Sequence, residues 1–248
     1  MKGRRAPIAS LAVGQRRLDG ALAHYLVRVL RLRAGDTFVA FDPTSSFEAD
    51  ATTVWAGDDA ITVQFGALRE AAVRTSRGLT WIQGLAKGDK CDAVVRDATE
   101  LGATRLVVVS TKRSVVKLER ERSEARQARW ARIAEQAARQ SGRGDVPLVD
   151  SPCAWPDALA RVDATDARFC LWEQAIEPLA PRLFDALARG ESLAFACGAE
   201  GGLDEDEVSL ARAQGWIIVT LGPRMLRTET VAAAVLGAVQ VWTGLFER

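Results

Sequence analysis

The chain has 248 residues, 48% of them hydrophobic, and 33 Lys and Arg against 32 Asp and Glu give a net charge of +1. This length suits one or two domains with a sizeable core, and no apolar run is long enough to span a membrane. The basic N-terminal segment lacks the apolar centre of a signal peptide, so we expect a cytoplasmic protein.

The cysteine and histidine content argues against two common kinds of active site. The four cysteines, Cys91, Cys153, Cys170 and Cys197, are far apart, and His24 is the only histidine. A Cys/His zinc site and Ser-His-Asp or Cys-His catalysis are therefore not expected. We expect His24 to cap a helix or pack in the core rather than to bind a ligand.

Charge is distributed unevenly along the chain. The net charge is +3 over residues 1–78, +4 over residues 79–150 and −6 over residues 151–248. The basic part could face the phosphates of a nucleic acid. Ordinary patchiness of an arginine-rich chain explains the same asymmetry equally well.

The first part of the chain, residues 1–73, reads as a small β-rich domain with one helix. Apolar residues at helical spacing predict the helix over 18–32, with Asp19 as a possible cap. Strands are predicted over 37–41, 47–54 and 60–65, with turn residues between them. This pattern indicates a small barrel, followed by a linker over 74–78.

The rest of the chain alternates between strand-like and helix-like segments. Strands are predicted over 79–85, 106–110, 168–172, 193–197 and 216–221, and helices over 89–101, 118–140, 179–188, 205–213 and 228–245. Gly102, Gly142, Gly190 and Gly215 stand where helices should end. The alternation predicts a parallel α/β sheet. The final helix is apolar on several faces, which indicates either deep burial or a dimer surface.

Two glycine turns, at Gly198/Gly201/Gly202 and at Gly222, follow the fourth and fifth predicted strands of this sheet. Ligands of open α/β sheets collect at the carboxyl ends of strands, where glycine lets the backbone approach them. The spacing is neither G-x-G-x-x-G nor a Walker loop, and four acids follow at 204–207. A polyphosphate would be repelled there, whereas a nucleoside would not. Asp204 also suits a helix N-cap, with Glu207 as its capping-box partner.

Four ordered motifs resemble those of the RsmE-type ribosomal RNA uracil-N3 methyltransferases, a branch of the SPOUT superfamily. They are D-A-T-E-L-G-A at 97–103, E-Q-A-A-R-Q-S-G-R at 135–143, C-G-A-E-G-G-L-D-E-D-E-V at 197–208 and L-G-P-R-M-L-R-T-E-T at 221–230. The segment H-Y-L-V-R-V-L-R-L-R-A-G-D at 24–36 is similar to the signature of the family's RNA-binding barrel. Ala199 stands where the family has proline, Val231 where it has alanine, and Pro43 where it has the glycine of an F-D-G turn.

The resemblance implies a fold and an assembly. Residues 1–73 would form a PUA-like RNA-binding β-barrel. Residues 74–248 would form a SPOUT methyltransferase domain, an α/β domain with a parallel sheet and a deep trefoil knot over about 168–248. The family forms homodimers through the knotted domain, which suits the apolar final helix.

The resemblance also implies a cofactor, S-adenosyl-L-methionine, held by three knot loops. An apolar slot for its adenine would come from the last loop, and the Glu200 carboxylate would tolerate its sulfonium. The residues carried over are Leu171, Trp172 and the neighbouring Glu173; Cys197, Gly198, Glu200, Gly201 and Gly202; and Leu221, Gly222, Met225, Leu226 and Thr228. No metal is implied.

The implied reaction is methylation of N3 of a uridine in small-subunit (16S) ribosomal RNA or in the assembled subunit. Arg227 is expected to stabilise the uracil anion or to orient the substrate. Glu229 is the other candidate catalytic residue, although a helix-start or ion-pair contact suits it better. Two alternatives stay open: another base or ring atom as the target, and a noncatalytic RNA-binding assembly factor.

RNA contacts are expected from basic and polar residues in both parts of the chain. Phosphate contacts from cationic side chains would make binding salt-dependent. The residues are Arg28, Arg31 and Arg33 in the small domain, and Arg113, Lys117, Arg139, Gln140, Ser141 and Arg143 in the larger one. A charged, solvated helix explains most of the charges over 120–132 equally well.

Overall fold

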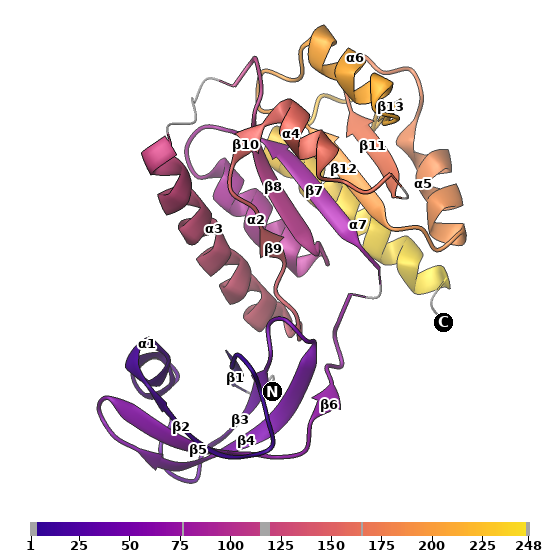
Figure 1. Cartoon of the computed structure of the whole chain (residues 1–248). Helices are drawn as coiled ribbons and strands as arrows, with labels where there is room; N and C mark the ends of the chain where they lie inside the picture. The colour runs from indigo at the N-terminus through magenta and orange to yellow at the C-terminus, as the bar shows by residue number, and fades with distance from the viewer. Residues whose placement is uncertain (1–3, 76, 115–119, 165, 247–248) are drawn as a thin grey trace. The chain divides into compact units, whose positions relative to one another are not determined.

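The computed structural model describes residues 4–75, 77–114, 120–164 and 166–246 (Figure 1). The chain divides into two compact units, one of residues 1–74 and 138–146, the other of residues 75–137 and 147–248. The boundary near residue 74 lies where the sequence predicts a linker. The helix predicted over 118–140, α3 (Arg120–Ser141), contributes its last residues to the first unit.

The first unit contains one sheet with strand order β1-β3-β4-β5-β2, and β6 pairs with β4. The strands are β1 (Arg5–Pro7), β2 (Gly14–Asp19), β3 (Thr37–Phe41), β4 (Phe47–Ala56), β5 (Ala60–Phe65) and β6 (Arg69–Glu70). Only β1 and β3 pair in parallel among the described strands of this sheet. Three strands therefore lie where the sequence predicts them, whereas the short β1, β2 and β6 were not predicted.

The predicted helix of the first unit is divided into α1 (Gly20–His24) and a π-helical turn, η1 (Tyr25–Val29). Ala23 and Leu26 point into a core shared with strand residues such as Phe38 and Ile61. Asp19 takes the N-cap position without a side-chain cap hydrogen bond. His24 is exposed in the last turn of α1, so the expectation that it caps or packs in the core is wrong.

The second unit is built on a seven-stranded sheet in which all described pairings are parallel, as predicted. The order is β10-β8-β7-β12-β11-β13, with β9 beside β8. The strands are β7 (Leu79–Gly84), β8 (Arg105–Ser110), β9 (Leu148–Val149), β10 (Cys153–Ala154), β11 (Ala167–Leu171), β12 (Leu193–Cys197) and β13 (Ile217–Val219). The short β9 and β10 carry no sequence signal.

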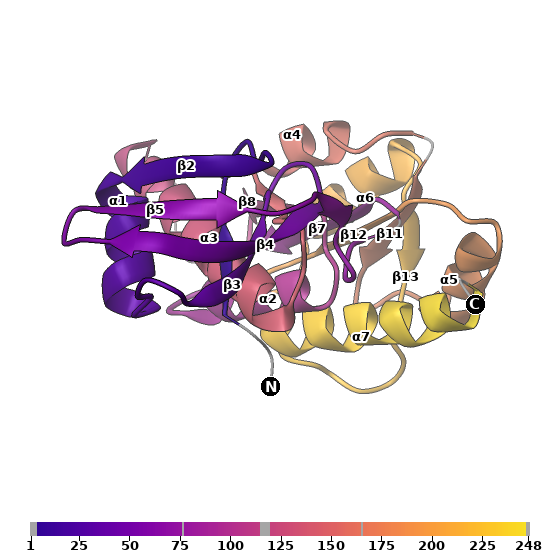
Figure 2. The same cartoon turned by 90° about the horizontal axis from the view of Figure 1, so that it is seen from below.

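Helices cover both faces of this sheet. Figure 2 shows α4 (Trp155–Ala160) and α6 (Glu205–Ala213) on one side, and α2 (Lys90–Glu100), α5 (Leu179–Ala188) and α7 (Thr228–Phe246) on the other. One core lies under α4 and α6 and includes Ile82 and Trp216. On alternate strand positions, Trp81, Phe169 and Phe195 form an aromatic row with ring centroids 5.5 and 5.9 Å apart. The helix α4 was not predicted.

The four glycines predicted to stop helices do so. Gly102, Gly142, Gly190 and Gly215 have φ between +72° and +93°, the left-handed conformation of a helix C-terminus. The capping box of α6 is also present, because the Asp204 side chain accepts from the Asp206 N–H and Glu207 accepts from the Asp204 N–H. The acids at 204–207 therefore serve the local fold.

Candidate functional site

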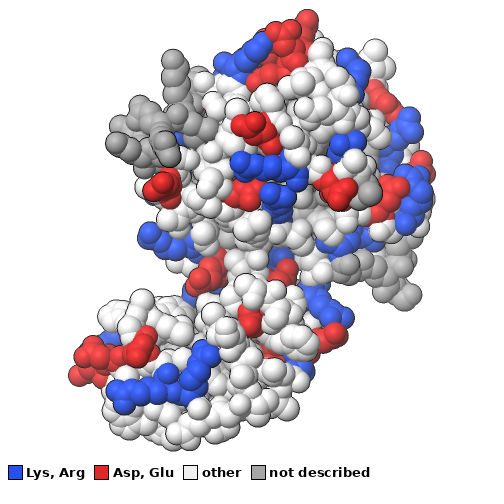
Figure 3. Space-filling model, in the orientation of Figure 1, with Lys and Arg blue, Asp and Glu red and all other residues white. Residues whose placement is uncertain are grey.

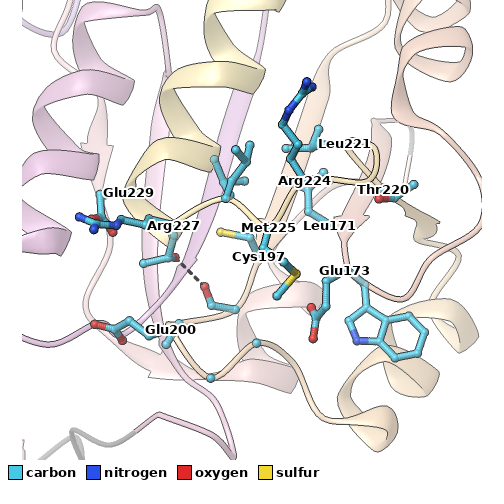
Figure 4. A pocket seen from close by; sticks show the side chains of 18 of the residues that line it. Leu171, Glu173, Cys197, Glu200, Thr220, Leu221, Arg224, Met225, Arg227 and Glu229 are labelled. Atoms are coloured by element: carbon cyan, nitrogen blue, oxygen red, sulfur yellow. Dashed lines mark hydrogen bonds between the residues drawn. The ribbon is translucent and has the colours of Figure 1, made fainter.

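Four strands of the parallel sheet end at the same level, and this register creates the candidate site. Leu171 of β11 stands opposite Cys197 of β12 and Val219 of β13, and Cys197 stands opposite Gln83 of β7. The loops that follow β11, β12 and β13 therefore leave the sheet side by side. Together with the start of α7 they enclose a cavity of about 610 Å³ (Figure 4).

The cavity brings together all the residues that the sequence assigned to the cofactor and to catalysis. The three loops contribute Leu171 to Glu173, Cys197 to Gly202 and Val219 to Thr228. Arg227 and Glu229 line the same cavity. Residues more than fifty positions apart in the chain thus share one site. The loop after β11, whose motif match was the loosest, is part of it.

Apolar side chains border the cavity on the last of these loops. Met225 is 82% exposed, and Leu221 and Leu226 are each 39% exposed. Side chains of this kind normally turn inward unless a ligand or partner covers them. In Figure 4, Met225 lies near the centre of the view. The arrangement offers an apolar surface of the kind that a planar base can contact.

Close backbone packing explains why Gly84 at the end of β7 and Gly198 in the loop after β12 have no room for a side chain. A Cβ atom on Gly84 would lie 2.2 Å from the Ala199 nitrogen, and one on Gly198 would lie 2.6 Å from the Gly202 carbonyl carbon. The turn closes through a 3.0 Å hydrogen bond from the Gly202 N–H to the Ala199 carbonyl. Ala199, in place of the family's proline, is 5% exposed and fits into this closed turn.

Glu200 is fixed at one side of the cavity. One of its carboxylate oxygens accepts from the Lys87 N–H at 3.0 Å and from Lys90 Nζ at 2.9 Å. Burial acts to raise the pKa of Glu200, but the hydrogen bonds from Lys90 and from backbone N–H groups outweigh burial and lower it. The carboxylate bonded to it raises the pKa of Lys90. Both groups therefore stay charged at neutral pH. No motif in the sequence pointed to Lys90 as a cavity-lining residue.

A buried side-chain amide links the loop after β12 to the start of α7. Gln83 Nε2 donates to Thr228 Oγ1 at 2.7 Å and to the Gly198 carbonyl at 3.2 Å, and its Oε1 accepts from Trp81 Nε1 at 3.1 Å. Thr228 in turn donates to the same carbonyl at 2.9 Å. Gln83 was not predicted; its only signal is a polar residue inside a buried strand.

The cysteine beside this amide does not behave as a nucleophile. Cys197 is 4% exposed, and burial raises the pKa of its thiol to about 12. The thiol donates to Gln83 Oε1 at 3.3 Å. It therefore stays protonated at neutral pH. Among the described residues there is no group of His, Cys, Asp and Glu suited to a metal ion.

Two polar atoms of the cavity-lining residues are buried without a hydrogen-bond partner. They are Trp172 Nε1, a donor, and Glu229 Oε2, an acceptor. Buried polar groups are normally paired, so an orphan donor and an orphan acceptor at a cavity indicate a ligand that completes them. No ion pair involves Glu229 within the described part of the chain, so the predicted ion-pair contact is not found.

The residues predicted to bind RNA fall into separate groups. Arg28, Arg31 and Arg33 line a hollow of the first unit, where Arg28 pairs with Asp58 at 2.7 Å. Arg139 lies 4.8 Å above the Tyr25 ring and donates to its hydroxyl. Gln140 is exposed and Ser141 is half-buried. On the face drawn in Figure 3, acidic and basic side chains are interspersed over both units.

Of the residues predicted to bind RNA, Arg113 keeps a position where it could contact phosphate, whereas Arg143 does not. Arg113 lies beside the cavity, where its Nη1 is 3.4 Å from the Gly201 carbonyl and its Nη2 3.7 Å from Asp204. Arg143 is only 2% exposed and is paired with Asp145, so its guanidinium has no surface to offer a phosphate; we leave it out of the proposed RNA contacts. Lys117 lies outside the described residues.

Comparisons with known proteins show which family this chain is similar to. A family model described as an RNA methyltransferase domain matches residues 74–240, and one described as an RNA methyltransferase PUA domain matches residues 18–65. The ribosomal RNA small subunit methyltransferase E of Bacillus subtilis is 31% identical over 92% of this chain and 90% of its own. That of Mycobacterium tuberculosis is 32% identical over 93% of this chain and 87% of its own.

Solved structures give the same result. Ribosomal RNA small subunit methyltransferase E from Neisseria gonorrhoeae, bound to S-adenosyl methionine, matches with a TM-score of 0.84 at 28% identity, over 96% of this chain and 95% of that one. The expected SPOUT-type α/β fold with an N-terminal PUA domain is confirmed, while the trefoil knot stays an implication of the resemblance. No described helix is long and apolar enough to cross a membrane. The chain belongs to the RNA methyltransferase family whose curated members are named ribosomal RNA small subunit methyltransferase E.

Proposed function

We propose that this chain transfers a methyl group from S-adenosyl-L-methionine to N3 of a uridine in small-subunit ribosomal RNA. The observation that carries the proposal is the meeting of three loops at one cavity, in a chain that matches a cofactor-bound relative over nearly its whole length. A cavity of about 610 Å³ is within the usual range for small-molecule sites.

The residues present fit this cofactor. Leu221, Met225 and Leu226 offer an apolar surface to an adenine. The Glu173 and Glu200 carboxylates line the cavity and favour a cationic ligand over a phosphate. When bound, the cofactor supplies an electrophilic methyl group, and the chain's own residues must orient and activate the nucleophile.

Activation of the uracil is the step that the protein must assist. Uracil N3 becomes a good nucleophile only when its proton leaves, and the resulting negative charge spreads to the ring oxygens. Arg227 is exposed at the cavity, and its position suits stabilisation of that charge. The Arg227 carbonyl also accepts from the Thr230 and Val231 N–H groups, so the residue starts α7 and has a fixed backbone.

RNA binding, dimerisation and location belong to the same proposal. Arg28, Arg31 and Arg33 would contact RNA phosphates in the first unit, and Arg113 would do so beside the cavity. Arg139 and Gln140 remain candidates in the first unit. Assembly into a homodimer through the knotted domain, and action in the cytoplasm on ribosomal RNA or the assembled subunit, follow from the family resemblance.

Calorimetric titration with S-adenosyl-L-methionine tests the cofactor site. We expect one site per chain and no detectable binding to Gly201→Val, because a Cβ at residue 201 would lie 2.9 Å from the Arg113 Cβ and displace the loop. Gly237→Ala, with open space around its added methyl, is the control. Absence of binding to the folded wild-type protein, with and without RNA, would refute the assignment. Mapping the methyl group on reacted small subunits then tests the N3 position.

A further inference from the structure

The carboxylate of Glu229 is the one acidic group at the cavity with a buried oxygen that lacks a partner among the described residues. Glu229 is in the first turn of α7, where the positive end of the helix dipole stabilises an anion. Its Oε2 is therefore a desolvated acceptor at the N-terminal end of that helix. Such an oxygen is completed by a donor from a ligand.

Two cations line the same cavity as this carboxylate. The Lys90 ammonium is influenced by the charges of both Glu229 and Arg227, and all three residues line the cavity. In Figure 4, Arg227, Glu229 and Glu200 occupy one side of the site, and Glu173 the other. Because Glu200 holds the Lys90 ammonium at 2.9 Å, the position of this cation is fixed before any substrate arrives.

We propose that Glu229 is the general base that removes the N3 proton of the uracil, and that Lys90, held by Glu200, stabilises the resulting anion together with Arg227. The assignment rests on the proposed function. In this step the N3–H bond breaks, its electron pair stays on N3, and the proton goes to Glu229 Oε2. The negative charge is shared among N3, O2 and O4, and N3 becomes the nucleophile.

The other acidic and thiol groups at the cavity suit the role less well. The bonded oxygen of Glu200 already accepts two hydrogen bonds, one from the Lys87 N–H and one from Lys90. Glu173 is exposed on the opposite side, so water satisfies its oxygens. The Cys197 thiol is protonated at neutral pH, since its pKa is about 12. Among these described groups, Glu229 alone has a desolvated oxygen without a partner, in a cavity that Lys90 and Arg227 also line.

Single-turnover methylation of small ribosomal subunits by Glu229→Gln tests the assignment. We expect the rate at neutral pH to fall by about 10²–10⁴-fold. The deficit should shrink about tenfold for each unit of rising pH, because hydroxide then removes the N3 proton without help from the protein. RNA in which 5-fluorouridine replaces the target uridine should rescue the variant in part, since its N3–H is more acidic.

Controls separate catalysis from folding and binding. Glu205→Gln changes an exposed acid in the first turn of α6 that is not among the cavity-lining residues, and the variant should react at the wild-type rate. Calorimetric affinity for S-adenosyl-L-methionine and filter-binding affinity for RNA should be unchanged in Glu229→Gln. Lys90→Met should lower the rate at every pH without the pH-dependent recovery, because the base is still present.

The outcomes distinguish this assignment from the proposed function. A methyl group mapped to N3, together with a Glu229→Gln deficit that is the same at every pH, would overturn the base and leave the function intact. A wild-type rate for Glu229→Gln would have the same meaning. A methyl group on another atom of the uridine would overturn the proposed function, and the assignment of Glu229 with it.

Discussion

At the residue scale, the proposed cofactor site depends on one buried amide, that of Gln83, which bonds cavity-lining residues without lining the cavity itself. Gln83 is 1% exposed and its amide is satisfied at both ends: the oxygen by Trp81 and Cys197, the nitrogen by Gly198, Thr228 and its own neighbour Gly84. Fully satisfied buried polar networks hold one conformation, whereas partly satisfied ones are costly. Gln83 therefore fixes two cavity-lining segments relative to each other.

We predict that Gln83→Leu weakens S-adenosyl-L-methionine binding measured by calorimetry. The variant leaves Trp81 Nε1 unpaired and removes the shared tether of Gly198 and Thr228. The unpaired group should also cost about 1–3 kcal/mol of unfolding free energy. Gln127→Leu is the matched control, because Gln127 bonds Val149 and Ser151 away from the cavity. Equal affinity losses in the two variants would contradict a specific role for Gln83.

Residue by residue, the motifs predicted which residues gather at one cavity, while their roles stay predictions. The residues assigned to the cofactor by motif line one cavity, because a motif preserves both the loop and its place in the sheet. Lys90 and Gln83 were missed, since their functions depend on partners about 110 and 145 positions away. Arg143 was misread for a different reason: Asp145 is only two residues away, but the burial of the Arg143 side chain is a property of the folded chain.

At the element scale, most long segments were predictable, although the six-residue β2 was not, and most segments of two or three residues were missed. The predicted α5, α6 and β12 have the observed bounds, and glycines in the left-handed conformation end four helices as expected. Strands of two or three residues, such as β9 and β10, carry no periodicity and form only because β8 offers hydrogen bonds to them. The π-helical turn in the first unit likewise has no signal in the helical spacing.

We predict that Glu207→Ala lowers the stability of the second unit by about 1–3 kcal/mol in urea unfolding. The buried Glu207 carboxylate accepts from the Asp204 N–H at 2.9 Å and from the Lys112 N–H at 2.8 Å, so its removal leaves two donors unpaired. Glu205→Ala, in the same turn but exposed, should change the urea midpoint little. If both variants unfold at the same midpoint, the capping box does not stabilise α6.

At the scale of the whole molecule, strand order lies beyond what periodicity can predict. The alternation of segments indicates a parallel sheet, but not that β12 lies between β7 and β11, with β13 on the far side of β11. That order brings the ends of β11, β12 and β13 together and so creates the cavity. It is set by long-range pairing, which local sequence does not record, although the glycine turns after two predicted strands already indicated a ligand site at the carboxyl ends of the strands.

The final helix indicates how two copies of the chain would assemble. Ala232, Val235, Leu236 and Val239 of α7 are buried within the unit. Another face carries Val241, which is 69% exposed, and Trp242, whose ring packs edge-on at 6.0 Å against the 46% exposed Phe184 of α5. Of the two alternatives read from the sequence, burial holds for one face of the helix, and a dimer surface stays a prediction for the other.

We predict that this outward surface, Phe184, Val241 and Trp242, forms part of the homodimer interface, and that Val241→Arg shifts the protein towards monomer in sedimentation velocity. A stable interface must bury roughly 800 Å² on each partner, and a charge placed in its apolar centre has no counter-ion there. Val13→Arg, at a valine 65% exposed in the first unit, is the control and should leave the sedimentation coefficient unchanged. A wild-type protein that sediments as a monomer, or a Val241→Arg dimer as tight as the wild type, would exclude this face.

Because the cavity lies within one unit of a single chain, the monomeric variant should still bind S-adenosyl-L-methionine, which separates assembly from cofactor binding.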